Sequence, residues 1–352
     1  MVLSDTLPSL RSAIILVASL AMLLSPGEAS TQNLPSADLN LGVYPGSLVT
    51  LTELVAQNVG IYKSHGLRVE LVNLRSGPDQ IAALANGSID IAALSVDNVM
   101  LANFRGQDLR VIIERLPVAI YTWLAQNNWP TPNKQKPYPQ NMVDLRGARL
   151  GVTARGAAVE HITRAIVRDA GLNPDRDLTY LAVGVGQQAI AAFKAKQIDV
   201  LVAFEPLQTV LIDGEKIAKP ILDLRFGEGP AKFNVWTTLS AVARRAELEK
   251  NPEKYRRFQE AHIAALKYMQ EPANFDHVVE IYLKHINLDK SLVESMLRKN
   301  IKSFGYIYNC IGHRNNGQFL AEAGLLKPEN VPSCKDLVWG EGYKYAVNLD
   351  DK

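Results

Sequence analysis

Hydrophobic positions in the first third of the chain follow the periods of short strands and helices in alternation. Four segments are predicted as strands, because their apolar residues alternate or run continuously: residues 39–44, 69–74, 89–94 and 109–113. Helices are predicted between them, with Gly60 ending the first and Gly77 opening the second. This order is typical of an α/β fold with a mostly parallel sheet.

Part of this pattern occurs twice, with the second copy 109 residues after the first. Residues 41–43 (Leu-Gly-Val) return as residues 150–152, and Ile89-Asp90 returns as Ile198-Asp199. A repeat of this length is a supersecondary unit used twice, not a solenoid period. Two similar α/β lobes leave a cleft between them, where small ligands commonly bind.

The repeat predicts two lobes that the chain crosses between twice. The first lobe is expected to be discontinuous, with residues 38–122 plus 238–352, and the second to cover residues 123–237. Strands near 120–125 and 233–240 would form the hinge between them.

Two further segments fall outside the repeat. Residues 128–141 contain four prolines and are predicted as a surface loop. Residues 251–302 carry apolar positions at helical spacing and are predicted as a helical C-terminal extension.

The N-terminus has the pattern of a secretory signal peptide covering residues 1–30. Arg11 precedes a short apolar run at 13–24, and small residues follow near Ala29. The run is too short to span a bilayer, although an N-terminal anchor helix is an alternative. We therefore expect export to the periplasm after cleavage.

The two cysteines, Cys310 and Cys334, are predicted to form a disulfide. Export would place them in an oxidising compartment, where such a pair can bridge. Two free thiols are the alternative.

Composition and motifs favour a binding protein over an enzyme. The formal net charge of +2 gives no reason to expect a nucleic-acid partner. None of the six histidines has metal-ligand spacing, and the chain lacks both the G-x-S-x-G and the phosphate-loop motifs. We therefore expect no catalytic residue, metal or cofactor; the G-x-G-x-x-A run at 184–189 is a weak dinucleotide signal, since it follows the second strand of its copy.

Candidate ligand-binding residues lie where strands end and the next helices begin, because ligands of parallel α/β lobes bind there. In the first lobe they are Tyr44, Gly46, Ser47, Ser76, Gly77, Ser95, Asp97 and Asn98. In the second lobe they are Thr153, Arg155, Gly156, Ala157, Gly186, Gln187, Phe204 and Glu205.

These residues suggest more than one ligand chemistry. Arg155 could hold a carboxylate, sulfonate or phosphate in bidentate fashion, or be a solvated loop arginine. Tyr44 and Phe204 could flank an apolar ligand or pack in the core. Asp97 and Glu205 could bind a ligand amine or orient Arg155.

Several segments resemble one family of transport proteins. Residues 144–152 (DLRGARLGV), 197–206 (QIDVLVAFEP) and 85–92 (ANGSIDIA) are similar to the periplasmic solute-binding proteins of ABC importers, in the nitrate, taurine and alkanesulfonate branch. The resemblance covers about residues 38–270. Sulfonate-type members often carry serines where this chain has residues 156–158 (Gly-Ala-Ala), which puts an alkanesulfonate ligand in doubt.

The resemblance implies a two-lobed, hinge-closing binding fold of type II that captures a small polar, anionic or mixed-charge organic solute. Its expected partners are a membrane permease with its ATPase, and a monomer is the family default. The alternatives are a ligand-sensing module for a membrane receptor and a synthase-like enzyme on the same fold, for which Asp97 or Glu205 would have to supply the catalytic group.

Overall fold

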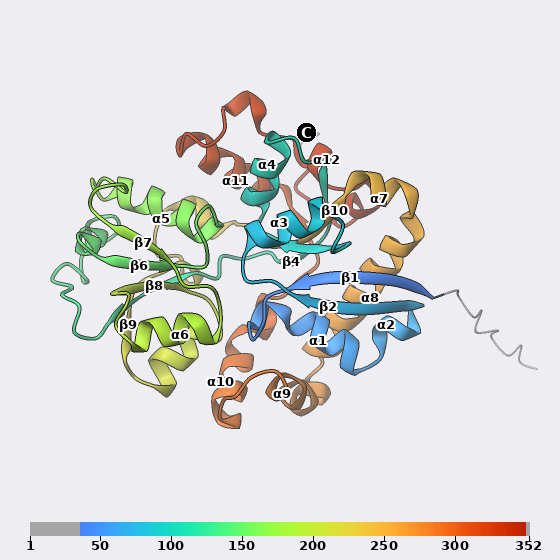
Figure 1. Cartoon of the computed structure of the whole chain (residues 1–352), viewed down its shortest axis with the longest axis horizontal. Helices are drawn as coiled ribbons and strands as arrows, with labels where there is room; N and C mark the ends of the chain where they lie inside the picture. The colour runs from blue at the N-terminus through green and yellow to red at the C-terminus, as the bar shows by residue number, and fades with distance from the viewer. Residues whose placement is uncertain (1–35, 350–352) are drawn as a thin grey trace, which may run out of the picture. The chain divides into compact units, whose positions relative to one another are not determined.

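The strands form separate sheets within residues 36–349, the part of the chain that the computed structural model describes (Figure 1). The predicted signal peptide lies outside these residues. The first sheets contain β1 (Ala37–Val43), β2 (Leu67–Asn73), β3 (Ala92–Leu94), β4 (Leu109–Leu116) and β10 (Leu239–Arg244). β1 pairs with β2 in parallel, β10 lies antiparallel between β3 and β4, and a bridge from Leu41 to Ile91 connects the two groups. We call these strands and their helices the first lobe.

The second lobe is built on one five-stranded sheet. Its strands are β5 (Thr122–Gln126), β6 (Arg149–Val152), β7 (Thr179–Ala182), β8 (Val200–Ala203) and β9 (Ala218–Asp223), in the order β7-β6-β8-β5-β9. β6 is parallel to β7 and β8, whereas β5 is antiparallel to β8 and β9. The predicted α/β class is confirmed, and the exact boundaries of the lobes stay a prediction.

The chain passes between the two lobes twice. β5 follows the first lobe in sequence but lies in the second sheet, and β10 returns from the second lobe to the first. The crossings lie in segments without helix or strand just before these strands, at 117–121 and 235–238. The hinge expected near 120–125 and 233–240 stays a prediction. The crossings are held side by side, because Thr238 donates from its backbone N to Leu116 O (3.0 Å) and from its hydroxyl to Val118 O (2.5 Å).

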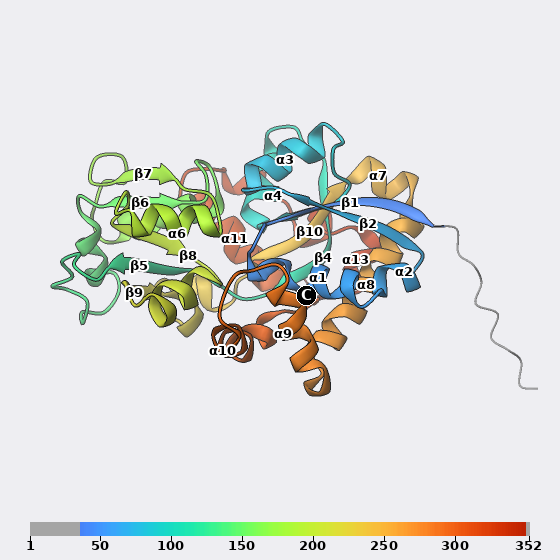
Figure 2. The ribbon, with the colours of Figure 1, turned by 60° about the horizontal axis from the view of Figure 1, so that its bottom comes forward.

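Helices flank both lobes, as Figures 1 and 2 show. In the first lobe they are α1 (Leu51–Asn58), α2 (Ile61–Ser64), α3 (Gly77–Ala85) and α4 (Val96–Phe104); in the second they are α5 (Ala158–Asp169) and α6 (Gln187–Lys194). The helix α3 begins at Gly77 as predicted, with the Ser76 hydroxyl accepting from Asp79 N at 3.2 Å.

The C-terminal region is helical, as predicted for residues 251–302. It contains α7 (Arg245–Lys250), α8 (Pro252–Gln270), α9 (Phe275–Leu283) and α10 (Lys290–Asn300), followed by α11 (Cys310–Glu322), α12 (Cys334–Leu337) and α13 (Gly340–Tyr343). Tyr255 and Phe258 on α8 are fully buried against the first lobe. Cys310 and Cys334, at the starts of α11 and α12, are joined by a disulfide with their Cα atoms 5.7 Å apart.

Candidate functional site

A small cavity of about 50 Å³ lies between the lobes, where strand ends meet the crossing segments. We call it the interlobe cavity. From the first lobe it is lined by Tyr44, Val49, Gly77, Ser95 and Asn98, from the second by Thr153, Ala157, Ala158, Val159 and Phe204, and from the crossings and the start of β10 by Ile120, Tyr121, Thr238 and Leu239. Strand ends of both repeat copies therefore converge on one site.

Four polar side chains at this cavity have no hydrogen-bond partner among residues 36–349. They are Ser95, which precedes α4 without capping it, together with Asn98, Tyr121 and Thr153. Each can donate and accept hydrogen bonds. These side chains are therefore available to hydrogen-bond a polar solute in the cavity.

Aromatic rings form the apolar part of the wall. Tyr121 meets Phe204 edge-on, with ring centroids 6.2 Å apart. The Tyr44 hydroxyl donates to Ala93 O at 3.0 Å. Burial raises the pKa of both tyrosines, and the negative charge of Asp97 raises each further. Both hydroxyls therefore stay protonated near neutral pH.

A buried ion pair holds one side of the wall in place. The Arg115 guanidinium donates to Val49 O at 2.8 Å and pairs with the carboxylate of Glu53. Arg115 and Glu53 are both almost completely buried. The bond to Val49 O holds this residue in place at the wall, although the Arg115 Nε and Nη1 atoms have no hydrogen-bond partner among residues 36–349.

Two predicted glycines allow close approaches. A Cβ on Gly77 would lie 2.8 Å from the Asn98 amide nitrogen, so a side chain there would push Asn98 aside. Gly186 has φ +57°, and its Cβ would lie 3.1 Å from Pro45 O in the other lobe. Packing between segments therefore explains both residues without an anion at the helix starts.

The structure brings seven predicted residues to the interlobe cavity: Tyr44, Gly77, Ser95, Asn98, Thr153, Ala157 and Phe204. The predicted Asp97 lies directly behind the wall. It is 1% exposed, and its carboxylate is 3.5 Å from His161 Nδ1 of α5 in the other lobe.

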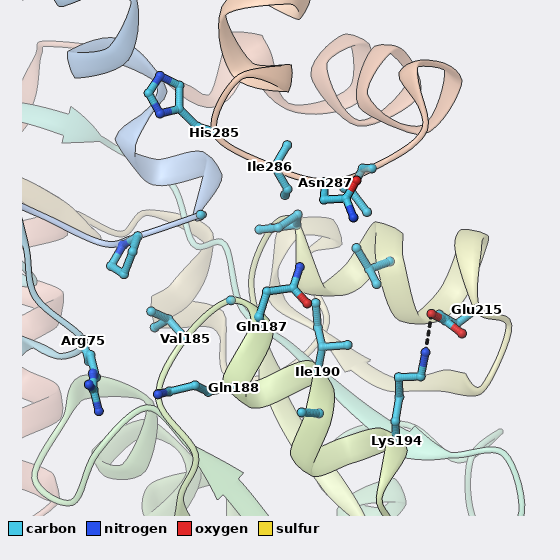
Figure 3. A pocket seen from close by; sticks show the side chains of 17 residues that line it. Arg75, Val185, Gln187, Gln188, Ile190, Lys194, Glu215, His285, Ile286 and Asn287 are labelled. Carbon is cyan, nitrogen blue, oxygen red and sulfur yellow. Dashed lines mark hydrogen bonds and ion pairs between the residues drawn. The ribbon is translucent and has the colours of Figure 1, made fainter.

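Three other predicted residues, Gly46, Gly186 and Gln187, line a second and larger cavity of about 800 Å³. Figure 3 shows this outer cavity, with Arg75 and His285 on one side and the residues of α6 on the other. Lys194 is neutralised there by Glu215 at 2.6 Å, whereas no ion pair involves Arg75 among the described residues. Burial lowers the pKa of His285.

Ser47, Ser76 and Glu205 have structural contacts. The Ser47 hydroxyl donates to the backbone oxygen of Glu205 at 3.2 Å, which ties the two lobes together. The Glu205 carboxylate accepts from Thr209 N at 3.1 Å, and burial raises its pKa. Neither side chain lines the interlobe cavity, so the predicted amine-binding role of Glu205 has no support in this arrangement.

The predicted anion-binding residue Arg155 lies away from both cavities. Its Nε donates to Glu160 at 3.0 Å, its side chain is 57% exposed, and its guanidinium lies over the Tyr180 ring. Gly156 N donates to the same carboxylate at 2.8 Å. Glu160, one turn into α5, therefore occupies the groups that the sequence analysis assigned to a ligand anion.

The strand-end rule missed the residues of the crossings and of the following helices. Ile120, Tyr121 and Thr238 precede β5 and β10 without periodic pattern. Val49 lies in the short 3-10 helix after β1, and Val159 lies in the first turn of α5. The predicted crossings could have identified the lining residues Ile120, Tyr121 and Thr238, since a chain that passes between two lobes has to run beside the cleft.

Residues 36–349 contain neither a candidate metal site nor a candidate membrane span. No three histidine, cysteine or acidic side chains of this region are grouped as ligands for a metal ion. No helix in the same region has the length and apolar character needed to span a membrane.

Comparisons with known proteins concern the family and the fold of the chain. The profile of the NMT1-like family matches residues 32–283. A binding protein of Brucella abortus is 26% identical over 291 residues, which is 82% of each chain. Among solved structures, the alkanesulfonate-binding protein of Xanthomonas axonopodis pv. citri, bound to MOPS, has a TM-score of 0.67 at 17% identity, covering 87% of this chain and 99% of its own. The periplasmic nitrate-binding protein of Synechocystis PCC 6803 has a TM-score of 0.69 at 14% identity, covering 88% of this chain and 89% of its own.

Proposed function

The chain belongs to the NMT1-like family, and on that basis we propose that it captures a small polar organic solute between its two lobes. The observation that carries the proposal is the set of four polar side chains without partners, Ser95, Asn98, Tyr121 and Thr153, around one cavity. Ser95 and Asn98 come from the first lobe, Thr153 from the second and Tyr121 from a crossing, so a bound solute would hold the lobes together. Solute binding would then favour the closed state by its additional contacts there.

The proposed destination of the solute is an ABC-type importer. The fold is that of periplasmic solute-binding proteins, and the compared structures include sulfonate- and nitrate-binding members. We propose that the chain is exported to the periplasm, acts without chemical turnover and docks as a monomer on a permease with its ATPase.

The charge of the solute cannot be assigned from Arg155. The sequence analysis favoured an anionic or mixed-charge molecule because of that residue, and in the structure Arg155 pairs with Glu160. A mixed-charge solute stays compatible with the site if its anionic group points toward the outer cavity. Arg75 lines that cavity and lies close in sequence to Gly77, which lines the interlobe cavity.

A thermal-shift screen tests the proposed capture. The mature protein is screened against sulfonates, nitrate, carboxylates, pyrimidines and amines. A solute at 100 times its dissociation constant stabilises the folded chain by about 2.7 kcal/mol, which raises Tm by a few degrees. No shift with any class of solute would contradict capture of these molecules.

Ser95→Ala localises the binding of any solute found. The variant removes one hydrogen bond without removing a helix cap, so affinity should fall about three- to tenfold while Tm without solute is unchanged. Ser88→Ala, on the exposed turn before β3, is the matched control. Equal affinities of the two variants by titration calorimetry would place the solute elsewhere.

A further inference from the structure

We infer that the solute carries a small organic cation with N–H donors, such as an ammonium or amidinium group, which is recognised by Asp97. This inference rests on the proposed function and adds the sign of the charge to it. The carrying observation is a carboxylate that is buried beside the interlobe cavity without a hydrogen-bond donor.

Asp97 is fixed next to the cavity by its position in α4. It lies in the first turn of this helix, between the lining residues Ser95 and Asn98, and is 1% exposed. The start of a helix favours negative charge, which allows a carboxylate at this place. Its negative charge acts on Tyr44 and Tyr121, both of which line the cavity.

The carboxylate lacks the partners that a buried charge requires. No hydrogen bond to Asp97 forms within residues 36–349, and its Oδ2 is completely buried. The nearest basic group is His161 at 3.5 Å, and the His161 Nδ1 also lacks a hydrogen-bond partner. Burying a carboxylate without donors is costly, and a donor from a ligand would offset that cost.

Other charges near the cavity do not favour an anion. No lysine or arginine is among its lining residues. The positive charge nearest to Tyr44 is Arg115, which Glu53 neutralises, whereas Asp79 in the first turn of α3 adds a second negative charge. An anionic group in the interlobe cavity would therefore lie near Asp97, with no lysine or arginine among the lining residues to compensate it.

A competing explanation is that Asp97 and a protonated His161 form a structural ion pair between α4 and α5. The two explanations predict opposite changes in the Tm of the solute-free protein when Asp97 is replaced by asparagine. If Asp97 is paired only when a ligand cation is bound, Asp97→Asn removes an unsatisfied buried charge from the solute-free protein. Its Tm should then rise by a few degrees. A structural pair instead predicts a lower Tm for this variant, and that result would overturn the inference.

Solutes of equal shape and different charge test recognition directly. The probes are benzamidine, benzamide and benzoate, with acetamidine, acetamide and acetate as a smaller series. For the wild-type protein the amidine should give the largest shift in Tm in each series, and Asp97→Asn should abolish this preference. Asp276→Asn, exposed in the first turn of α9, is the matched control and should keep it.

The outcomes separate the inference from the proposed function. Stronger binding of benzoate, acetate or the amides than of the amidines would overturn the cation and leave capture standing. If none of these six probes binds, the inference is tested by the charge of the solute that the thermal-shift screen identifies. A neutral or purely anionic solute would overturn the inference. A failure of every solute in both screens would contradict capture itself.

Discussion

Glu114 is a carboxyl group on β4 that is completely buried in the first lobe. Burial raises its pKa to about 8, although it accepts hydrogen bonds from Arg115 N and Leu116 N, both at 3.0 Å, and from the Ser240 hydroxyl. The folded protein therefore holds a proton there that the unfolded chain releases near pH 4.5. This contribution to stability is complete below pH 4.5 and is lost as the pH rises through 8.

Glu114→Gln should remove this pH dependence, because the amide resembles the protonated carboxyl in shape. The wild-type protein is expected to lose roughly 1.4 kcal/mol of unfolding free energy per pH unit across the window relative to the variant. Urea unfolding at pH 5, 7 and 9 measures this difference. Glu260→Gln, exposed on α8, is the control, and parallel pH profiles of wild type and Glu114→Gln would contradict the expectation.

Single residues show what the sequence could reveal of the site. Ser95 and Thr153 were predicted because they follow apolar strands, and strand ends can be located from hydrophobic pattern alone. The direction of the Arg155 side chain could not be predicted, since it depends on Glu160 five residues later. Tyr121 was missed because it lies in a segment with no periodic pattern.

At the scale of elements, the repeat in the sequence corresponds to a repeated hydrogen-bond pattern. Asp90 accepts from Asn40 N at 2.8 Å, and Asp199 accepts from Arg149 N at 2.9 Å, in the equivalent place of the second lobe. Asp90 thus holds the middle of β1, and Asp199 holds the first residue of β6. A glycine is needed at position 151 of β6, since a Cβ there would lie 2.5 Å from the Ile198 side chain.

Removing either aspartate should destabilise the protein by a similar amount. Asp90→Ala and Asp199→Ala each leave a backbone N–H without its acceptor, and we expect a loss of about 1–3 kcal/mol of unfolding free energy. Asp276→Ala, exposed in the first turn of α9, should change it by less than about 0.5 kcal/mol. Unlike effects at the two repeat positions, measured by urea unfolding, would argue against equivalent roles.

The sequence predicted the existence of most elements better than their ends. The helices of residues 251–302 were predicted because proline and apolar spacing mark them, and α8 begins at Pro252. The strand predicted at 89–94 is reduced to β3 at Ala92–Leu94, because Asp90 turns to the backbone of Asn40 instead of extending the ladder. The helices α11 to α13 lacked a clear apolar period and were not predicted.

At the scale of the whole molecule, the two crossings of the chain explain how two lobes can form one binding site. The crossings at 117–121 and 235–238 pass beside the cavity, contribute lining residues to it and are hydrogen-bonded to each other. The Ser47–Glu205 contact adds a link between the lobes outside the crossings. The sequence could predict two lobes and two crossings, but the choice between two cavities depended on side-chain packing.

The most direct test of the account is a crystal structure of the protein grown with the solute that the thermal-shift screen identifies. We predict electron density for the solute in the interlobe cavity, within hydrogen-bond distance of Ser95, Asn98 or Thr153. Solute bound only in the outer cavity beside Arg75, or only on the surface of one lobe, would contradict capture at this site.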